Sequence, residues 1–155
     1  MKILKQILKI AFDIGGVIID IDNEIIFDEA IMSINLFVKK FGKENIYIIS
    51  KAKQKYIQKN MDHFSKVNFF KKTNMKIDNV IFVPEYIDKQ YWCKKLNINY
   101  MIDDYIKIIR CILDINTIPI WFGMERKFTP IKNDRIIYSK NWKSLRKILM
   151  TISKS

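Results

Sequence analysis

The stretch LKIAFDIGG, residues 8–16, joins a short apolar run to an aspartate and two consecutive glycines. A run that is apolar along its whole length and ends at a turn signal is typical of a strand buried on both faces. Gly15 and Gly16 predict a turn directly after the strand, since glycine is among the strongest turn-forming residues. The stretch therefore places the Asp13 carboxylate at the carboxyl end of a buried strand.

Similar apolar runs recur along the chain and alternate with segments of helical spacing. The further strands are predicted at NIYIIS (45–50), VIFV (80–83), NYMIDD (99–104), TIPIWFG (117–123) and RIIY (135–138). Helices are predicted over 25–40, 51–60, 88–96, 105–113 and 141–152, with Asn141 as the cap of the last one, while 61–76 has no clear pattern. Strands of this kind alternating with helices predict an α/β protein with a three-layer, Rossmann-like fold. Its central sheet is expected to be mostly parallel, with about five or six strands.

The length of 155 residues predicts a single domain over 1–155, with a core that needs neither disulfides nor a structural metal. No apolar run reaches the roughly 20 residues that a membrane helix needs. Lys5, Lys9 and Asp13 interrupt the apolar start MKILKQILKIAFD, which is therefore predicted to be a first core strand and not a secretory leader.

The cysteine and histidine content narrows the chemistry. Cys93 and Cys111 form no CxxC pattern, so we expect reduced thiols and a cytoplasmic protein. His63 is the only histidine, which excludes a histidine-rich zinc site.

The formal net charge of +12 has two interpretations. A basic chain can bind nucleic acid. The excess of lysine over arginine, with abundant isoleucine and asparagine, is also what an A+T-rich coding sequence produces, and phosphate-binding proteins tend to favour arginine. Both interpretations stay open at the level of sequence.

Polar residues end several of the predicted strands: Asp13, Ser50, Asp103 and Asp104. In parallel sheets the ligand crevice lies beyond the carboxyl ends of the strands, so these side chains are expected to meet there. Each one also fits a local role, as a turn residue in the case of Asp13 and as a helix cap in the others.

Together with Lys89, in DKQYWCKKL, these strand ends resemble the four motifs of the haloacid dehalogenase-like hydrolases. The motifs occur in the family's order, and the resemblance runs from about Lys9 to Gly123. The lysine is the least certain motif by spacing, because Lys94 and Lys95 follow in the same segment.

The resemblance implies a phosphoryl-transfer site. Asp13 would be the nucleophile that forms an aspartyl-phosphate, Ser50 would donate to a phosphoryl oxygen, and Lys89 would neutralise charge. A magnesium ion would be bound by Asp13, Asp103 and the backbone carbonyl of Gly15. Asp104 would hold Lys89 or contact a metal-bound water.

The sequence departs from the family pattern in two ways. The family's usual second aspartate, which acts as general acid and base, is replaced by Gly15, and Asp20 and Asp22 are the nearest substitutes. The intervals between the motifs are also too short for a cap domain. Capless relatives act on macromolecules, including nucleic-acid ends, or borrow a lid through oligomerisation.

These patterns predict a magnesium-dependent phosphomonoesterase acting on a nucleotide or a phosphorylated macromolecule, without a membrane partner. The alternative is a catalytically impaired module of the same fold that binds a phosphorylated partner or nucleic acid. Tyr86 and Tyr91 are candidates to flank the substrate.

Overall fold

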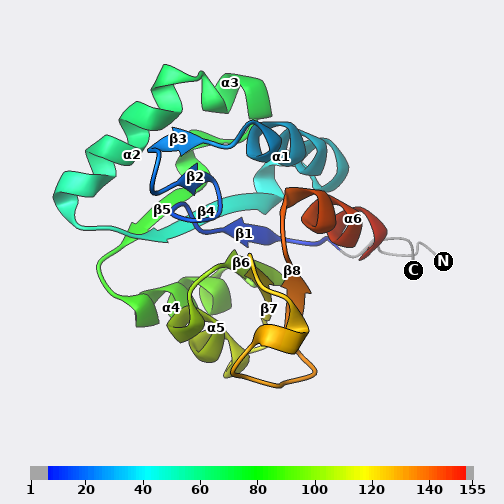
Figure 1. Cartoon of the computed structure of the whole chain (residues 1–155). Coiled ribbons are helices and arrows are strands. Elements are labelled where there is room, and N and C mark those ends of the chain that lie inside the picture. The colour runs from blue at the N-terminus through cyan, green and yellow to red at the C-terminus, as the bar shows by residue number, and fades with distance from the viewer. Residues whose placement is uncertain (1–6, 153–155) are drawn as a thin grey trace.

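The computed structural model describes residues 7–152. Its central sheet has six strands in the order β5-β4-β1-β6-β7-β8, and every neighbouring pair is parallel (Figure 1). The strands are β1 Ile10–Phe12, β4 Ile46–Lys51, β5 Val80–Val83, β6 Tyr100–Asp103, β7 Ile118–Phe122 and β8 Ile137–Ser139. The predicted α/β, Rossmann-like class is confirmed, and each predicted strand is present with its bounds shifted by a few residues at most.

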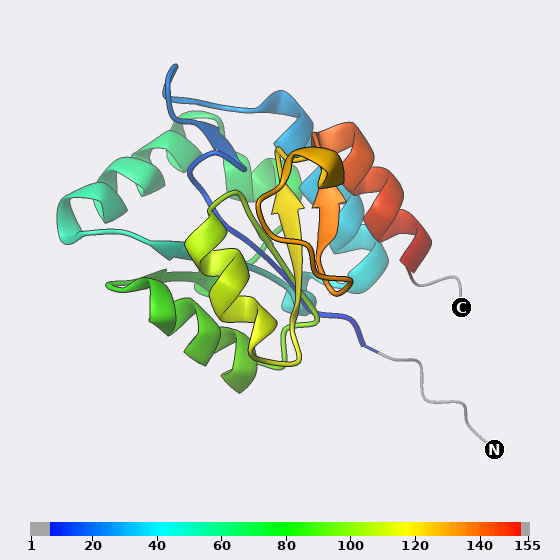
Figure 2. The ribbon, with the colours of Figure 1, turned by 60° about the horizontal axis from the view of Figure 1, so that its bottom comes forward.

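Helices cover both faces of the sheet (Figures 1 and 2). One face carries α1 Asp28–Phe41, α2 Gln54–Lys66, α3 Phe69–Thr73 and α6 Trp142–Ile152, and the other carries α4 Tyr86–Lys95 and α5 Ile106–Leu113. Three single-turn 3₁₀ helices, Lys43–Asn45, Ile77–Asn79 and Arg126–Phe128, occupy connections. Asn141 caps α6 as predicted, since its Oδ1 accepts the Ser144 N–H at 2.9 Å.

The central strand β1 is buried on both sides because its side chains alternate between two cores. Phe12 stacks on Phe37 of α1 and Trp142 of α6, with ring centroids 6.0 and 5.8 Å away. Ala11 faces the opposite way and belongs to the core beneath α4 and α5. All three β1 residues are fully buried, which explains why the strand is apolar along its length.

A small antiparallel hairpin, β2 Ile19–Asp20 and β3 Ile25–Ile26, lies outside the main sheet. The prediction of a helix over 25–40 was wrong at its start, because Ile25 and Ile26 pair with β2 and α1 begins only at Asp28. The Phe27 N–H also donates to the Ile18 carbonyl at 3.0 Å, which continues the strand-like pairing up to the helix.

The segment without a clear pattern, 61–76, contains the end of α2 and the short helix α3. Asn68, in the left-handed region at φ 54°, separates the two helices, and Phe64 and Phe69 pack ring to ring at 4.5 Å. Within residues 7–152, the chain thus consists of the six-stranded sheet, the helices on its two faces and this hairpin.

The apolar N-terminal segment forms a strand only over Ile10–Phe12, and residues 1–6 lie outside the described part of the chain. Among the described helices, the combination of length and apolar character that a bilayer crossing requires does not occur. Cys93 and Cys111 are both free thiols on helices, as expected.

Candidate active site

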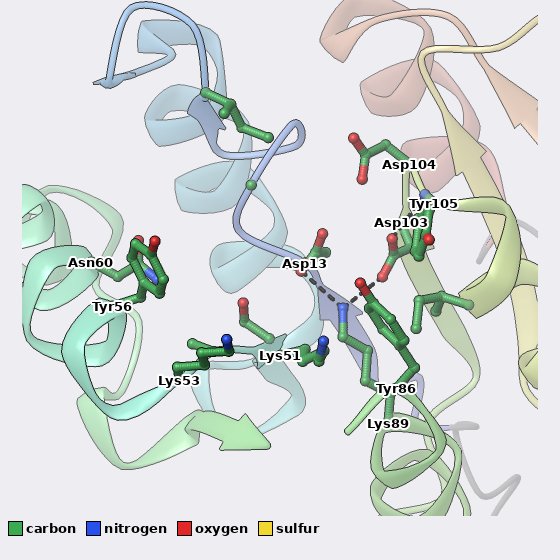
Figure 3. Close-up of a pocket in the computed structure, with 15 residues that line it drawn as sticks. Asp13, Lys51, Lys53, Tyr56, Asn60, Tyr86, Lys89, Asp103, Asp104 and Tyr105 are labelled. Atoms are coloured by element: carbon green, nitrogen blue, oxygen red, sulfur yellow. Dashed lines mark hydrogen bonds and ion pairs between the residues drawn. The ribbon is translucent and has the colours of Figure 1, made fainter. Parts of the chain in front are cut away.

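A cavity of about 470 Å³ opens at the carboxyl ends of β1, β4 and β6 (Figure 3). All six residues predicted for the site line it: Asp13, Gly15, Ser50, Lys89, Asp103 and Asp104. The sheet register explains part of this convergence. Phe12 pairs with Ile102, so the next residues along the two neighbouring strands, Asp13 and Asp103, lie beside each other. The Asp13 N–H donates to the Ile102 carbonyl at 2.9 Å and so extends this pairing.

Lys89 lies between the two carboxylates. Its Nζ donates to Asp13 Oδ1 at 2.9 Å and to Asp103 Oδ2 at 2.8 Å, and its side chain is only 2% exposed. Burial disfavours the charge on Lys89, but the two carboxylates outweigh this and raise its pKa above the usual range. Lys94 and Lys95, the other candidates by spacing, are exposed and do not line the cavity.

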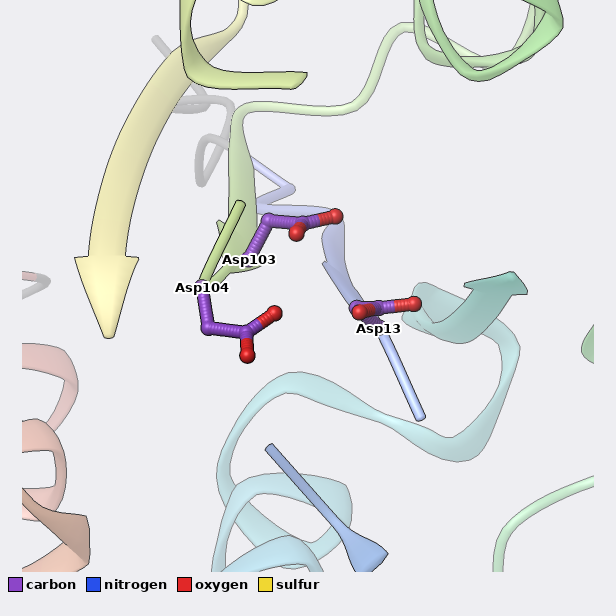
Figure 4. Close-up of side chains that lie close together, drawn as sticks. All are labelled: Asp13, Asp103 and Asp104. Carbon is purple, nitrogen blue, oxygen red and sulfur yellow. The ribbon is translucent and has the colours of Figure 1, made fainter. Parts of the chain in front are cut away.

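Three carboxylates crowd one side of the cavity (Figure 4). Asp13, Asp103 and Asp104 each offer an oxygen atom within 4.8 Å of the others. Burial and the Asp13 carboxylate raise the pKa of Asp103, against the effect of Lys89. Partial burial and the Asp13 carboxylate raise the pKa of Asp104 to about 6. One lysine does not neutralise three carboxylates, so the cluster attracts a further cation.

This donor set fits magnesium. Carboxylate oxygens are the protein ligands that Mg²⁺ prefers, and the ion commonly uses one or two of them together with waters and substrate phosphates. The backbone at Gly15 lines the same cavity. Asp13, Asp103 and Asp104 therefore form a candidate metal centre. The sequence predicted Asp13 and Asp103 as ligands with the Gly15 carbonyl, and Asp104 only as a residue that holds Lys89 or contacts a metal-bound water; Lys89 is held by Asp13 and Asp103 instead.

Ser50 stands near the end of β4, with the residue 4% exposed. Its hydroxyl makes no hydrogen bond to any residue within 7–152, although it lines the cavity. It does not cap α2, since Lys53 occupies the N-cap position. A hydroxyl that is open to the cavity and has no protein partner can bond to a ligand there.

Gly15 and Gly16, which follow Asp13, differ in whether the structure leaves space for a side chain. Gly16 has φ 78°, and a Cβ placed on it would lie 2.0 Å from Asp104 Oδ2. A side chain at this position would therefore displace the Asp104 carboxylate. At Gly15 an added Cβ would meet only Ile21 Cδ1 at 3.4 Å, an ordinary contact.

The closing helix holds the turn that follows Asp13. The Trp142 indole Nε1–H donates to the Val17 carbonyl at 2.9 Å, and this bond is buried. Within the turn, the Ile18 and Ile19 N–H groups both donate to the Ile14 carbonyl, at 2.8 and 3.0 Å. The backbone beside the proposed nucleophile is therefore fixed from two directions.

The helix-cap role considered for Asp103 is not found, because Tyr105 is the N-cap residue of α5 and no side chain caps that helix. The Asp103 Oδ1 accepts the Tyr105 N–H at 3.0 Å and its Oδ2 accepts from Lys89, so the same carboxylate holds the loop before α5 and faces the cavity. The Trp121 Nε1–H donates to the Asp104 carbonyl at 3.3 Å, which holds the end of this loop.

Asp20 and Asp22 do not replace the missing acid in this structure. Neither lines the cavity, and Asp20 accepts the Asp22 N–H at 3.0 Å and the Asn23 side-chain amide at 2.7 Å within the hairpin turn. Of the two tyrosines considered at the level of sequence, Tyr86 lines the cavity and Tyr91 does not.

Sequence reasoning missed eight of the lining residues: Ile21, Lys51, Ala52, Lys53, Tyr56, Asn60, Tyr105 and Ile108. Lys53, Tyr56 and Asn60 follow an i, i+3, i+7 pattern along α2, which is the signature of one helix face. That pattern was the available signal. It was concealed because the segment KAKQKYIQKN is polar on all sides.

No protein-family model and no curated protein sequence matches the chain. Solved structures do match it. The D,D-heptose 1,7-bisphosphate phosphatase from Burkholderia thailandensis aligns with a TM-score of 0.64 and 8% identity, over 93% of this chain and 99% of that one. A haloacid dehalogenase-like hydrolase from Burkholderia xenovorans aligns with a TM-score of 0.64 and 7% identity, over 91% and 96%.

A third structure, a haloacid dehalogenase-like family hydrolase from Xanthomonas campestris, aligns with a TM-score of 0.61 and 8% identity, over 83% of this chain and 55% of that one. Identities this low support a statement about the fold, while function has to be argued from the site itself. The chain has the fold of the haloacid dehalogenase-like hydrolases, as its strand-end motifs predicted.

Proposed function

We propose that this protein is a magnesium-dependent phosphomonoesterase that works through an aspartyl-phosphate on Asp13. The observation that carries the proposal is the buried Lys89 bridge between Asp13 and Asp103, beside a third carboxylate and a free serine hydroxyl. Phosphoryl transfer depends on positioning and on charge stabilisation. A lysine and metal-binding carboxylates beside the nucleophile can supply both.

Asp13 is suited to attack phosphorus. Lys89 occupies its Oδ1, which leaves Oδ2 for the new bond. Oδ2 attacks the phosphorus of the ester, and the bond from phosphorus to the leaving oxygen breaks, with its electron pair passing to the leaving group. Water then cleaves the aspartyl-phosphate, releasing phosphate and restoring the carboxylate.

The surrounding residues position the phosphoryl group. Ser50 donates a hydrogen bond to one phosphoryl oxygen, and Lys89 orients Asp13 while adding positive charge. Asp13, Asp103 and Asp104 would hold Mg²⁺, which supplies charge neutralisation at the phosphoryl oxygens.

Gly15 occupies the usual position of the general acid. Among residues 7–152, the carboxylates that line the cavity are those of the proposed metal centre, which leaves no further one to protonate the leaving group. General acid help is typically worth about 10²- to 10⁴-fold, so substrates with good leaving groups are expected to react best. The substrate we propose is a nucleotide or a phosphorylated macromolecule, supported by the open, lysine-bearing cavity and the charge of +12.

The glycine at position 15, in place of the usual acid, also favours a second candidate. This is a catalytically impaired module that binds a phosphorylated partner or nucleic acid. A metal-centred phosphate site without an acid can bind its ligand without turning it over. The two candidates make different predictions for turnover and the same prediction for phosphate binding.

The deciding experiment measures release of p-nitrophenolate from p-nitrophenyl phosphate with Mg²⁺, in the wild type and in Asp13→Asn. The phenolate leaves without protonation, so the missing acid does not hide an active nucleophile. Turnover that Asp13→Asn and EDTA both abolish supports the phosphatase. Phosphate binding with no turnover in the wild type favours the binding module. Turnover that Asp13→Asn retains contradicts both the phosphatase with Asp13 as nucleophile and the binding module without turnover.

A further inference from the structure

The outer part of the cavity is lined by aromatic and apolar side chains that remain open to solvent. Tyr56, Tyr105 and Ile21 line it and are 45%, 37% and 65% exposed. They come from α2, from the loop before α5 and from the hairpin, which are separate elements. Figure 3 shows Tyr56 on one side of the cavity and Tyr86 and Tyr105 on the other. Apolar surface gathered at a cavity in this way marks a place where a ligand covers it.

The tyrosines on one side are held in place. Tyr86 and Tyr105 pack with ring centroids 5.1 Å apart, and Lys51 Nζ lies 4.0 Å from the centroid of the Tyr86 ring. Lys51 and Tyr105 thus both contact Tyr86, and these contacts orient this wall of the cavity.

Two lysines lie between the aromatic walls and the carboxylates. Neither Lys51 nor Lys53 has a carboxylate within 4.0 Å among residues 7–152, whereas Lys89 has two. Both line the cavity. Their two positive charges are available to a ligand. They would balance a phosphate dianion in a site where Lys89 and a bound divalent ion would offset the three carboxylates.

The α2 face extends the cavity away from Asp13. Lys53, Tyr56 and Asn60 span seven residues, or about 10 Å at the rise of an α-helix. This is longer than one phosphoryl group, and its chemistry changes from a cation to an aromatic ring to a side-chain amide. Asn60 offers both a donor and an acceptor, which a polar ring edge can use and a plain phenyl ring cannot.

We propose, on the basis of the phosphatase function above, that the cavity binds a nucleotide. Its base lies against Tyr56 and Tyr105, its ring edge hydrogen-bonds to Asn60, and its phosphate lies between Asp13 and the lysines Lys51 and Lys53. The nucleotide can be free or can be the terminal unit of a strand, because both present the same base, sugar and phosphate.

The test compares adenosine 5′-monophosphate with ribose 5-phosphate, which release the same kind of 5′-alkoxide and differ in the base. Stacking of a base on an aromatic side chain is worth a factor of about 5 to 150. The wild type should therefore show a kcat/KM for the nucleotide that is higher by a factor in this range. Tyr56→Ala should reduce the preference for the nucleotide to about twofold or less, while Tyr56→Phe should retain it.

Tyr91→Ala is the matched control, since Tyr91 is 56% exposed and lies outside the cavity. Lys53→Ala should raise KM for both substrates by about tenfold, the lower end for a charged contact, while Lys66→Ala on the same helix should not. The base site is overturned if the preference for the nucleotide over ribose 5-phosphate survives in the double variant Tyr56→Ala, Tyr105→Ala. It is also overturned if Tyr91→Ala removes the preference.

Binding without turnover separates this inference from the proposed function. The probe is the phosphonate analogue of adenosine 5′-monophosphate, in which a methylene group replaces the ester oxygen, measured by calorimetry against methylphosphonate. Tighter binding of the adenosine phosphonate that depends on Tyr56 supports the base site even if no phosphate is released. Equal binding by both probes, with p-nitrophenyl phosphate still hydrolysed, removes the base site and leaves the phosphatase.

The same assay with a short 5′-phosphorylated oligoadenylate distinguishes the two sources of the nucleotide. A kcat/KM for the oligonucleotide at or above that of the mononucleotide, with the same dependence on Tyr56, identifies a strand end as the ligand. Activity on the mononucleotide alone identifies a free nucleotide.

Discussion

Replacing Lys89 by methionine tests the electrostatics of the site directly. Methionine keeps an unbranched side chain of similar length, so the main loss is the charge that joins Asp13 Oδ1 and Asp103 Oδ2. Two carboxylates then face each other, and Asp103 is fully buried. Removing one partner of a buried ion pair typically costs about 3–5 kcal/mol. For a chain of this size that corresponds to a fall in Tm of about 6–20 °C.

The assay is thermal unfolding in EDTA, with Lys94→Met as the control. Lys94 is exposed on the same helix, and its replacement should change the free energy of unfolding by no more than about 0.5 kcal/mol. Magnesium should then raise the Tm of Lys89→Met more than that of the wild type, because the carboxylates of the variant have no other cation. Combining Lys89→Met with Asp13→Asn and Asp103→Asn should recover most of the loss.

The pH dependence of the same variant has a defined sign. Burial and the Asp13 carboxylate raise the pKa of Asp103 in the folded protein above its usual value of 3.8, and loss of Lys89 raises it further. The folded state then binds a proton that the unfolded state lacks, so stability falls as pH rises from the unfolded value through the folded one. The deficit of Lys89→Met should therefore be smaller at pH 5 than at pH 8. This account of the site would be refuted if Lys89→Met had the Tm of the wild type in EDTA. It would also be refuted if the loss of stability in Lys89→Met were the same at pH 5 and pH 8.

Four further outcomes are expected. Magnesium should raise the Tm of the wild type, and Asp103→Ala should remove most of this rise; equal stabilisation of both would exclude the proposed metal centre. Gly15→Asp, whose Cβ would make only van der Waals contact with Ile21, should accelerate sugar phosphates more than p-nitrophenyl phosphate, within the roughly 10²- to 10⁴-fold range of general acid help, and a flat response would mean that another group protonates the leaving oxygen. A thiol reagent should modify Cys111 in the native protein and Cys93 only after unfolding, because burial raises the pKa of the Cys93 thiol to about 12; rapid labelling of both would contradict the packing of α4. If the charge of +12 is compositional, binding of DNA or RNA should be lost between about 50 and 200 mM salt, whereas binding that persists indicates a localised nucleic-acid surface.

The sheet and its strand-end residues could be predicted because their signals are local and strong. A parallel strand covered on both faces must be apolar along its whole length, so β1, β4 and β6 stand out, and the polar residue that ends each one points to the edge where ligands bind. Asp13 and Asp103 follow from this reasoning alone, since adjacent parallel strands bring their ends together.

The hairpin and the outer cavity could not be predicted from the same signals. Strands of two residues are too short to show an alternation, and Ile25 and Ile26 also fit the helical spacing that follows them. The face of α2 that lines the cavity depends on tertiary contacts, among them the ion pair of Lys59 with Glu24 at the hairpin. Selecting Lys89 over its neighbours required the resemblance to a family, because the three lysines look alike in composition.

The bond from Trp142 to the Val17 carbonyl has a consequence for the order of events during synthesis. The two residues are 125 positions apart, so the turn beside Asp13 leaves the ribosome long before the indole that fixes it exists. At about 5–20 residues per second, the interval is on the order of 6–25 s. Asp13 and its turn are thus made well before the indole that completes the geometry beside them. A nascent chain stalled before Trp142 is expected to have this sheet edge without the bond that fixes the turn of the proposed site.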